Sequence, residues 1–214
     1  MSTKRAILET EEIYHVYNRS ERGIKIFDSP RENELFLDTI RYYLQVNPPA
    51  KFSFYRKNPE KFPFIIQPKL ATIINYSLMP THFHFTLRQE QEAGIKKFIE
   101  RISNSFAHYF NISRDGRGGV FERNFKAIHV ENDYQLIHLS RYIHLNSVTS
   151  YLVENPEDYP YSSYRTYIGL ESQSMVDPTE VMSQFSSIEQ YKKFVMNQKN
   201  YQRELKKIKD FLLE

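Results

Sequence analysis

Two β-strand patterns joined by a short turn constrain the fold of this 214-residue chain more than any other feature. Residues 70–78 and 82–87 are rich in β-branched and aromatic residues, and Met79-Pro80-Thr81 between them favours a turn. Strands separated by so few residues pair as an antiparallel hairpin. The chain should therefore contain an antiparallel sheet that includes this hairpin.

The order of the remaining elements predicts the fold class. Further strands are expected at residues 12–18 and 125–130, and helices begin near Ser29, Gly94 and Asn132. The helix from Gly94 has an apolar stripe of period 3.6, made of Ile95, Phe98, Ile99, Ile102, Phe106 and Phe110. This order is the split βαβ pattern. We predict an α+β fold, a ferredoxin-like (RRM-like) sandwich with a four-stranded antiparallel sheet, helices on one face and added C-terminal helices.

The domain organisation follows from where these patterns end. We predict one domain over residues 1–170, in which residues 47–68 form an insertion, and a helical tail over 171–214. The N-terminus has no apolar stretch of signal-peptide length, and no run reaches the roughly 18 residues of a membrane span. We therefore expect a cytoplasmic, nucleoid-associated protein with no membrane partner.

Composition narrows the chemistry. The chain has no cysteine, which excludes disulfides, thiolate metal sites and cysteine nucleophiles. Its net charge of +3 is too small to indicate a nucleic-acid partner. Local patterns must therefore identify the function.

The most specific local pattern is the triplet His82-Phe83-His84 at the start of an expected strand. Side chains alternate along a strand, so the two histidines share one face and can converge on one divalent ion. Two histidines on a solvated sheet face would give the same triplet. A metal site therefore needs a further ligand and a reactive group.

The helix expected near residues 133–148 supplies both. Tyr142 and Asn146 are four residues apart and face the same way. Asn146 offers an amide oxygen as a hard metal ligand, and Tyr142 offers a phenol that can act as a nucleophile. With sixteen tyrosines in the chain, a half-buried packing role is the alternative for Tyr142. His138 and His144 on this helix are more typical of surface or internally bonded histidines than of ligands.

Three segments in order carry a family resemblance: YHVYNR at 14–19, MPTHFHF at 79–85 and RYIHLNSV at 141–148. They resemble the single-tyrosine HUH transposases and are most similar to the REP-associated tyrosine transposase branch. A later segment, YSSY at 161–164, is also similar, and the resemblance spans about residues 12–168. Two positions depart from that branch, because Ser147 replaces its usual proline and Tyr161 its usual tryptophan.

The resemblance implies a DNA transposase, a metal-dependent enzyme that nicks and joins single-stranded DNA beside a hairpin or palindromic repeat. His82, His84 and Asn146 would bind a divalent metal, Mg²⁺ or Mn²⁺. Tyr142 would attack the scissile phosphodiester and form a 5′-phosphotyrosine intermediate. Relatives include dimers that exchange the tyrosine helix and monomers, so both a monomer and a homodimer stay open.

DNA contacts are expected where positive charge gathers. Residues 94–126 hold seven Lys or Arg and three acidic residues. The proposed DNA-binding residues are Arg19, Arg114, Arg117, Arg123 and Lys126. Tyr109 and Phe121 are candidates for stacking on unpaired bases. The alternative for the charged helix is a solvated face.

Two other functions remain as alternatives. A domesticated, non-catalytic descendant would bind DNA or RNA hairpins without cutting them. An ordinary metallohydrolase would use water as the nucleophile and leave Tyr142 a structural residue.

Overall fold

The computed structural model describes residues 8–62 and 68–199. Its centre is a four-stranded antiparallel sheet in the order β2-β3-β1-β4. The strands are β1 (Ile13–Arg19), β2 (Ala71–Met79), β3 (His82–Gln89) and β4 (Lys126–His129). Met79 pairs with His82, which confirms the expected hairpin. The ferredoxin-like α+β prediction is therefore correct.

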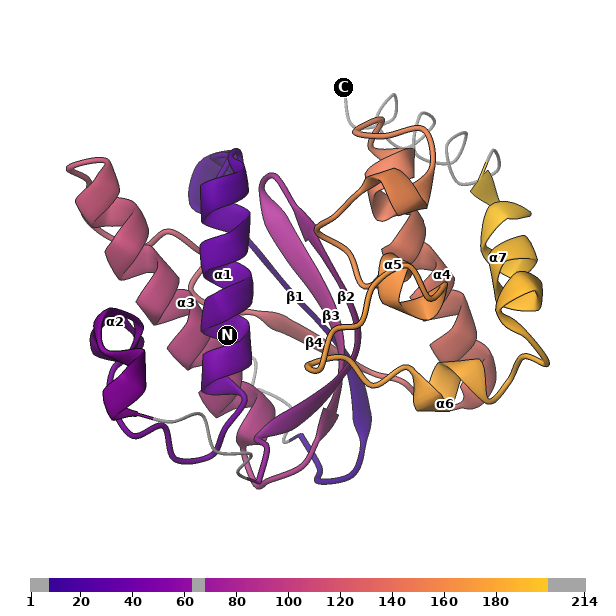
Figure 1. Ribbon diagram of the computed structural model, residues 1–214, viewed down its shortest axis with the longest axis horizontal. Coiled ribbons are helices and arrows are strands. Elements are labelled where there is room, and N and C mark those ends of the chain that lie inside the picture. The colour runs from indigo at the N-terminus through magenta and orange to yellow at the C-terminus, as the bar shows by residue number, and fades with distance from the viewer. Residues whose placement is uncertain (1–7, 63–67, 200–214) are drawn as a thin grey trace, which may run out of the picture.

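One face of the sheet is apolar and is covered by two helices (Figure 1). Phe83, Phe85 and Leu87 alternate along β3 and are fully buried beneath α1 (Pro30–Tyr43) and α3 (Gly94–Ser113). The predicted apolar stripe of α3 is buried along its whole length. Helix α1 begins with a capping box, as its Ser-Pro start leads one to expect.

The opposite face is covered by α4 (Asp133–Thr149) and the elements after it (Figure 1). Asn132 caps α4 and accepts a hydrogen bond from the backbone N–H of Gln135. Beyond α4 come α5 (Tyr164–Tyr167), α6 (Thr179–Met182) and α7 (Ile188–Met196). Three short 3-10 turns complete the elements: η1 (Glu21–Gly23), η2 (Pro59–Lys61) and η3 (Pro156–Asp158).

The segment predicted to be an insertion carries one short helix, α2 (Phe52–Lys57). It packs back on α1, where the rings of Tyr55 and Tyr42 are stacked 4.5 Å apart. The Tyr42 hydroxyl also donates a hydrogen bond to the Ala50 carbonyl at 2.6 Å. Residues 63–67 of this segment lie outside the described part.

The predicted tail is described as far as residue 199. Its helix α7 buries Tyr191 and Val195 in the same apolar core as the sheet. Residues 200–214, which were expected to continue this helix, and residues 1–7 at the N-terminus lie outside the described residues. Within 8–62 and 68–199, no helix has the length and apolar character needed to cross a membrane.

Candidate active site

The sheet face beneath α4 gathers the polar side chains of the strands. Residues paired across antiparallel strands point to the same face. His84 pairs with Tyr17 of β1, and Tyr17 pairs with Lys126 of β4. One row further, His82 pairs with Arg19. The register therefore brings the histidine pair together with two of the predicted DNA-binding residues.

The two histidines of the triplet converge, as their alternation along β3 predicts. Their ring centroids are 5.0 Å apart and the rings are nearly perpendicular, at 87°. Each ring uses its Nδ1 atom within the protein: His82 Nδ1 lies 3.0 Å from Thr81 Oγ1, and His84 Nδ1 lies 2.9 Å from His15 Nε2. An ion held by this pair would therefore bind through the Nε2 atoms.

Helix α4 places Tyr142 over this pair. Its ring centroid is 5.6 Å from that of His84 and 6.3 Å from that of His15, edge-on to both. The side chain is 42% exposed, so its hydroxyl lies at the boundary between the site and solvent. Asn146, one turn further along α4, is buried, and its side chain lowers the pKa of Tyr142.

Burial keeps His84 and His15 neutral and Tyr142 protonated. Burial, followed by the nearby His82, His15 and Arg19, lowers the pKa of His84 well below its usual value. Burial also lowers the pKa of His15 to about 4. Burial raises the pKa of Tyr142, an effect that the Arg19 guanidinium opposes. At neutral pH the His84 imidazole therefore keeps the lone pair that a metal ligand needs.

The donor set fits a hard divalent ion. The buried Asn146 Nδ2 has no hydrogen-bond partner among the described residues. Because the two ends of an amide have nearly the same shape, a half-turn of this group would present its oxygen instead. In residues 8–62 and 68–199, no three His, Cys, Asp or Glu side chains form a metal-binding group. The candidate set thus consists of His82, His84 and the amide of Asn146.

A buried hydrogen-bond chain fixes α4 above the sheet. His144 is fully buried; its Nδ1 lies 2.6 Å from the Tyr191 hydroxyl and its Nε2 lies 2.8 Å from Ser163 Oγ. Ser163 Oγ accepts a hydrogen bond from the Tyr76 backbone N–H of β2 at 2.9 Å. The other histidine of the helix, His138, contacts Arg141 instead, at 2.6 Å. Both histidines are internally bonded, as the sequence indicates.

Two predicted DNA-binding residues lie beside the site. Arg19 and Lys126 line one hollow of about 240 Å³ together with Tyr17, Asn18 and Glu122. Both side chains are exposed. Positive charge at this edge of the histidine face suits a DNA phosphate.

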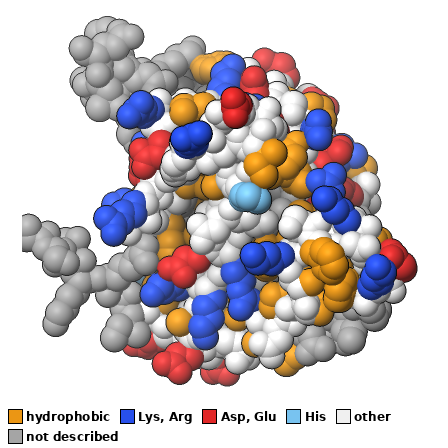
Figure 2. Space-filling view, turned by 90° about the vertical axis from the view of Figure 1, so that its left-hand side faces the viewer, with side chains coloured by type: hydrophobic (Ala, Val, Ile, Leu, Met, Phe, Trp, Pro, Cys, Tyr) orange, Lys and Arg blue, Asp and Glu red, His pale blue; other side chains and the backbone are white. Residues whose placement is uncertain are grey.

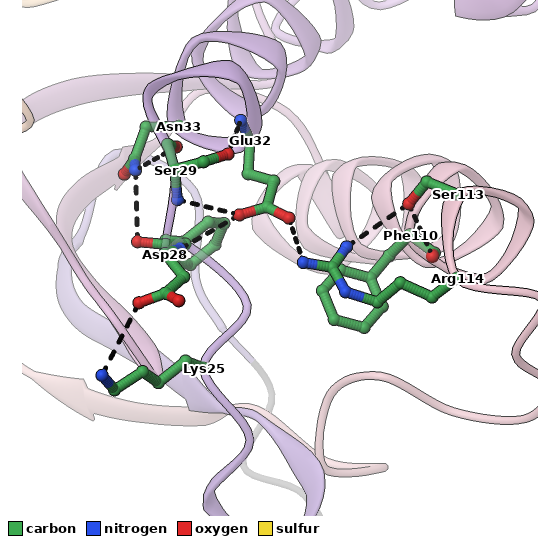
Figure 3. Close-up of polar contacts among 9 residues, drawn as sticks. Lys25, Asp28, Ser29, Glu32, Asn33, Phe110, Ser113 and Arg114 are labelled. Atoms are coloured by element: carbon green, nitrogen blue, oxygen red, sulfur yellow. Dashed lines mark hydrogen bonds and ion pairs between the residues drawn. The ribbon is translucent and has the colours of Figure 1, made fainter.

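Arg114 lies on the other side of the sheet, at the C-terminal end of α3 (Figure 3). Its guanidinium pairs with Glu32 of α1 and lies 3.9 Å from the centre of the Phe110 ring. Glu32 also accepts hydrogen bonds from the backbone N–H groups of Asp28 and Ser29, at 3.1 and 3.0 Å. Arg114 therefore joins α3 to the start of α1 and does not lie with the histidines.

The other two predicted DNA-binding residues, Arg117 and Arg123, do not line the hollow that contains Arg19 and Lys126. Arg117 is exposed in the loop after α3, and Arg123 lines a cleft of about 500 Å³ between α3 and residues 119–125. On the face seen in Figure 2, several Lys and Arg side chains lie next to one another below the central histidine, and others lie singly among acidic and hydrophobic ones. The stacking role predicted for Phe121 is wrong, because this ring is 7% exposed and packs on Phe83 in the core.

His15 is the site residue that sequence reasoning assigned no role. It was visible as part of the YHVYNR segment, and its alternation with Tyr17 places both on the face beneath α4. Its contact with His84 joins strand positions that are diagonal neighbours, because His15 pairs with Thr86 and Tyr17 with His84. The alternation of side chains along a strand does not show which diagonal neighbours on adjacent strands are in contact.

Comparisons with known proteins give one family match and similar solved structures. Residues 56–146 match the model of the family described as "Transposase IS200 like". A solved REP-associated tyrosine transposase bound to a REP hairpin is similar in fold, with a TM-score of 0.54 and 15% identity over 83% of this chain and 98% of that one. A candidate transposase from Deinococcus radiodurans matches with a TM-score of 0.37 and 12% identity, over 67% of this chain and 95% of that one. No curated protein matches the chain.

The family match begins in α2 and ends at Asn146, so it contains the histidine pair and the tyrosine. The resemblance to single-tyrosine HUH transposases found in the sequence is thereby confirmed. Residues 56–146 of this chain are thus similar to the IS200-like transposases.

Proposed function

We propose that this transposase cuts and rejoins single-stranded DNA beside a hairpin, with Tyr142 as the nucleophile. The observation that carries the proposal is the position of Tyr142, whose ring lies edge-on to His84 at 5.6 Å and which shares helix α4 with Asn146, one turn away. A phenol, the two imidazoles of the triplet and a buried amide thus meet on one face of the sheet. The solved relative that binds a REP hairpin supports a hairpin as the DNA partner.

In the proposed cleavage step, Tyr142 Oη forms a bond to phosphorus and the bond from phosphorus to the 3′ oxygen breaks. The phenol loses its proton, and the departing 3′ oxygen gains one. The products are a 5′-phosphotyrosine and a free 3′-hydroxyl, and attack by a 3′-hydroxyl on that link rejoins DNA. One ester replaces another, so the step needs no ATP.

Residues around Tyr142 partly offset the rise in its pKa that burial causes. Burial keeps its phenol protonated at neutral pH. The charge of Arg19 lowers the pKa of Tyr142, and the nearby Asn146 side chain lowers it as well. Arg19 and Lys126 would also hold the phosphates on either side of the scissile bond, because they line the same hollow.

We propose that His82, His84 and Asn146 hold a divalent ion, Mg²⁺ or Mn²⁺. When bound, such an ion supplies charge stabilisation at the phosphoryl oxygen. The two imidazoles and the amide are uncharged, so they leave the positive charge of the ion unneutralised. Arg117 and Arg123 are proposed as further DNA contacts, whereas Arg114, which is engaged with Glu32, has the weakest case.

Covalent capture tests the role of Tyr142. The protein is incubated with Mn²⁺ or Mg²⁺ and a pool of labelled hairpins whose single-stranded flanks are randomised. Protein–DNA adducts are separated on a denaturing gel and the attached DNA is sequenced. Tyr142→Phe should abolish the adduct. The matched control is Tyr134→Phe on the same helix, where Tyr134 is 70% exposed, and it should leave the adduct intact.

Each alternative has a distinct outcome. Metal-dependent cleavage without an adduct would refute the tyrosine mechanism and favour a hydrolase that uses water. Hairpin binding that Tyr142→Phe leaves unchanged, with no cleavage in either metal, would favour a domesticated DNA- or RNA-binding module. Size measurement with and without DNA separates a monomer from a homodimer.

A further inference from the structure

His15 makes the most specific contact to the candidate metal ligands. Its Nε2 lies 2.9 Å from Nδ1 of His84, and the two ring planes differ by only 18°. A ring N–H lies in the plane of its imidazole, so near-coplanar rings are the arrangement in which one nitrogen points its proton at the other. The contact is therefore a directed hydrogen bond between strands β1 and β3.

This bond has two possible directions, and only one leaves His84 able to bind a metal. A neutral imidazole carries one proton. If His84 accepts from His15, its proton is on Nε2 and that atom has no lone pair to offer. If His84 Nδ1–H donates to His15 Nε2, His84 Nε2 has its lone pair. An acceptor opposite Nδ1 thus selects the tautomer that ligation needs.

His15 is not itself a ligand alongside His84 in this arrangement. The ring centroids are 5.2 Å apart, so the two nitrogens point straight at each other. An ion on both lone-pair axes would therefore lie on the line between them and hold them about 4 Å apart, since each metal–nitrogen bond is about 2.0–2.1 Å. The observed 2.9 Å has room only for a proton. The ring is also enclosed by Tyr17 and Tyr142, with centroids 5.0 and 6.3 Å away, which restrains its orientation.

We propose that His15 is a positioning residue that accepts the Nδ1 proton of His84 and thereby holds His84 Nε2 ready for the divalent ion. The inference rests on the proposed function, because it takes His84 as a ligand. It adds a role for the histidine of the YHVYNR strand, which acts through His84 and not on DNA.

Two substitutions separate this role from simple packing. His15→Phe keeps a planar ring but removes the acceptor. His15→Gln can place an amide oxygen where Nε2 lies and so restores the acceptor. Unfolding midpoints of both variants, measured without metal, show whether either change only damages the fold.

The first measurement needs no metal. Long-range ¹H–¹⁵N NMR of histidine side chains, assigned with His84→Gln, reports which His84 nitrogen carries the proton. We expect the Nδ1–H form in the wild type and in His15→Gln, and a mixture or the Nε2–H form in His15→Phe. A wild type with the proton on Nε2 would overturn the proposal.

The second measurement is the Mn²⁺ affinity of the DNA-free protein by calorimetry. His15→Phe should weaken it by about 10- to 100-fold, and His15→Gln should bind close to the wild type. If His15→Phe has the same Mn²⁺ affinity and the same His84 tautomer as the wild type, the role of His15 is refuted, and the proposed function is not affected. A wild type with the Nδ1–H form but no Mn²⁺ affinity would support the His15–His84 bond and refute the metal site of the proposed function.

Discussion

Acid should loosen the attachment of the tyrosine helix, and His144 is the group through which it acts. Burial lowers the pKa of His144 to about 3, whereas an exposed histidine in the unfolded chain titrates near 6.5. Below pH 6.5 the unfolded chain therefore binds a proton that the folded chain refuses. Stability is lost as the pH falls from 6.5 towards 3, and the loss levels off below that.

The size of the effect follows from the distance between the two pKa values. A pH of 4.5 lies two units below the pKa of the histidine in the unfolded chain, whereas folded His144 is still neutral. The folded state therefore loses about 3 kcal/mol of stability, at roughly 1.4 kcal/mol per pH unit. His15 and the carboxyl groups add their own pH dependence. Those contributions are common to the wild type and a His144 variant, so they cancel in the difference.

The perturbation is His144→Gln, which cannot take up the proton but retains an amide for Ser163 and Tyr191. Urea unfolding followed by circular dichroism at pH 7.5, 6.5, 5.5 and 4.5 gives the free energy of unfolding. The variant should be less stable at pH 7.5 and should lose about 3 kcal/mol less than the wild type by pH 4.5. The control is His108→Gln, on the exposed surface of α3. Parallel profiles for the wild type and His144→Gln would refute the reasoning.

Three further predictions concern packing and charge. Gly94→Ala should lower the free energy of unfolding by about 3 kcal/mol or more, because the new Cβ would collide with the backbone carbonyl oxygen of Leu70. Gly119→Ala is the control, and equal urea midpoints for the two variants would contradict this prediction. Glu32→Ala should cost about 1–2 kcal/mol through loss of the capping box, and an unchanged midpoint would contradict it. Arg117→Ala should reduce the salt slope of hairpin binding by about 1 and Arg114→Ala should not; the reverse would make Arg114 the DNA contact.

Local signals explain how much of the fold was predictable. Some features depend only on residues that are close in the sequence. Three of them are present in the structure: the apolar stripe of α3, the Ser29 cap of α1 and the Asn132 cap of α4. Element order then favoured one sheet topology. The strands differ from their expected bounds by only one or two residues. Such features are set by periodicity and capping, which need no knowledge of tertiary contacts.

Partners that meet only in the folded chain were not predictable. Arg114 looked like a phosphate-binding residue in a glycine-rich loop, but it pairs with Glu32, 82 positions away. Phe121 was a candidate for stacking on unpaired bases, yet it is buried in the core beside Phe83. Neither sequence neighbourhood contains the partner, so neither role is encoded locally.

The two faces of the sheet explain why the site depends on such distant pairs. The apolar face needs only volume and period, whereas a buried polar face is stable only if its groups find hydrogen-bond partners. His15 bonds with His84, 69 positions away, and His144 bonds with Tyr191, 47 positions away. The first bond orients a candidate ligand, and the second holds the helix that carries Tyr142. Small changes on this face should therefore reduce the proposed DNA cleavage before they unfold the protein, because the proposed cleavage depends on both bonds at once.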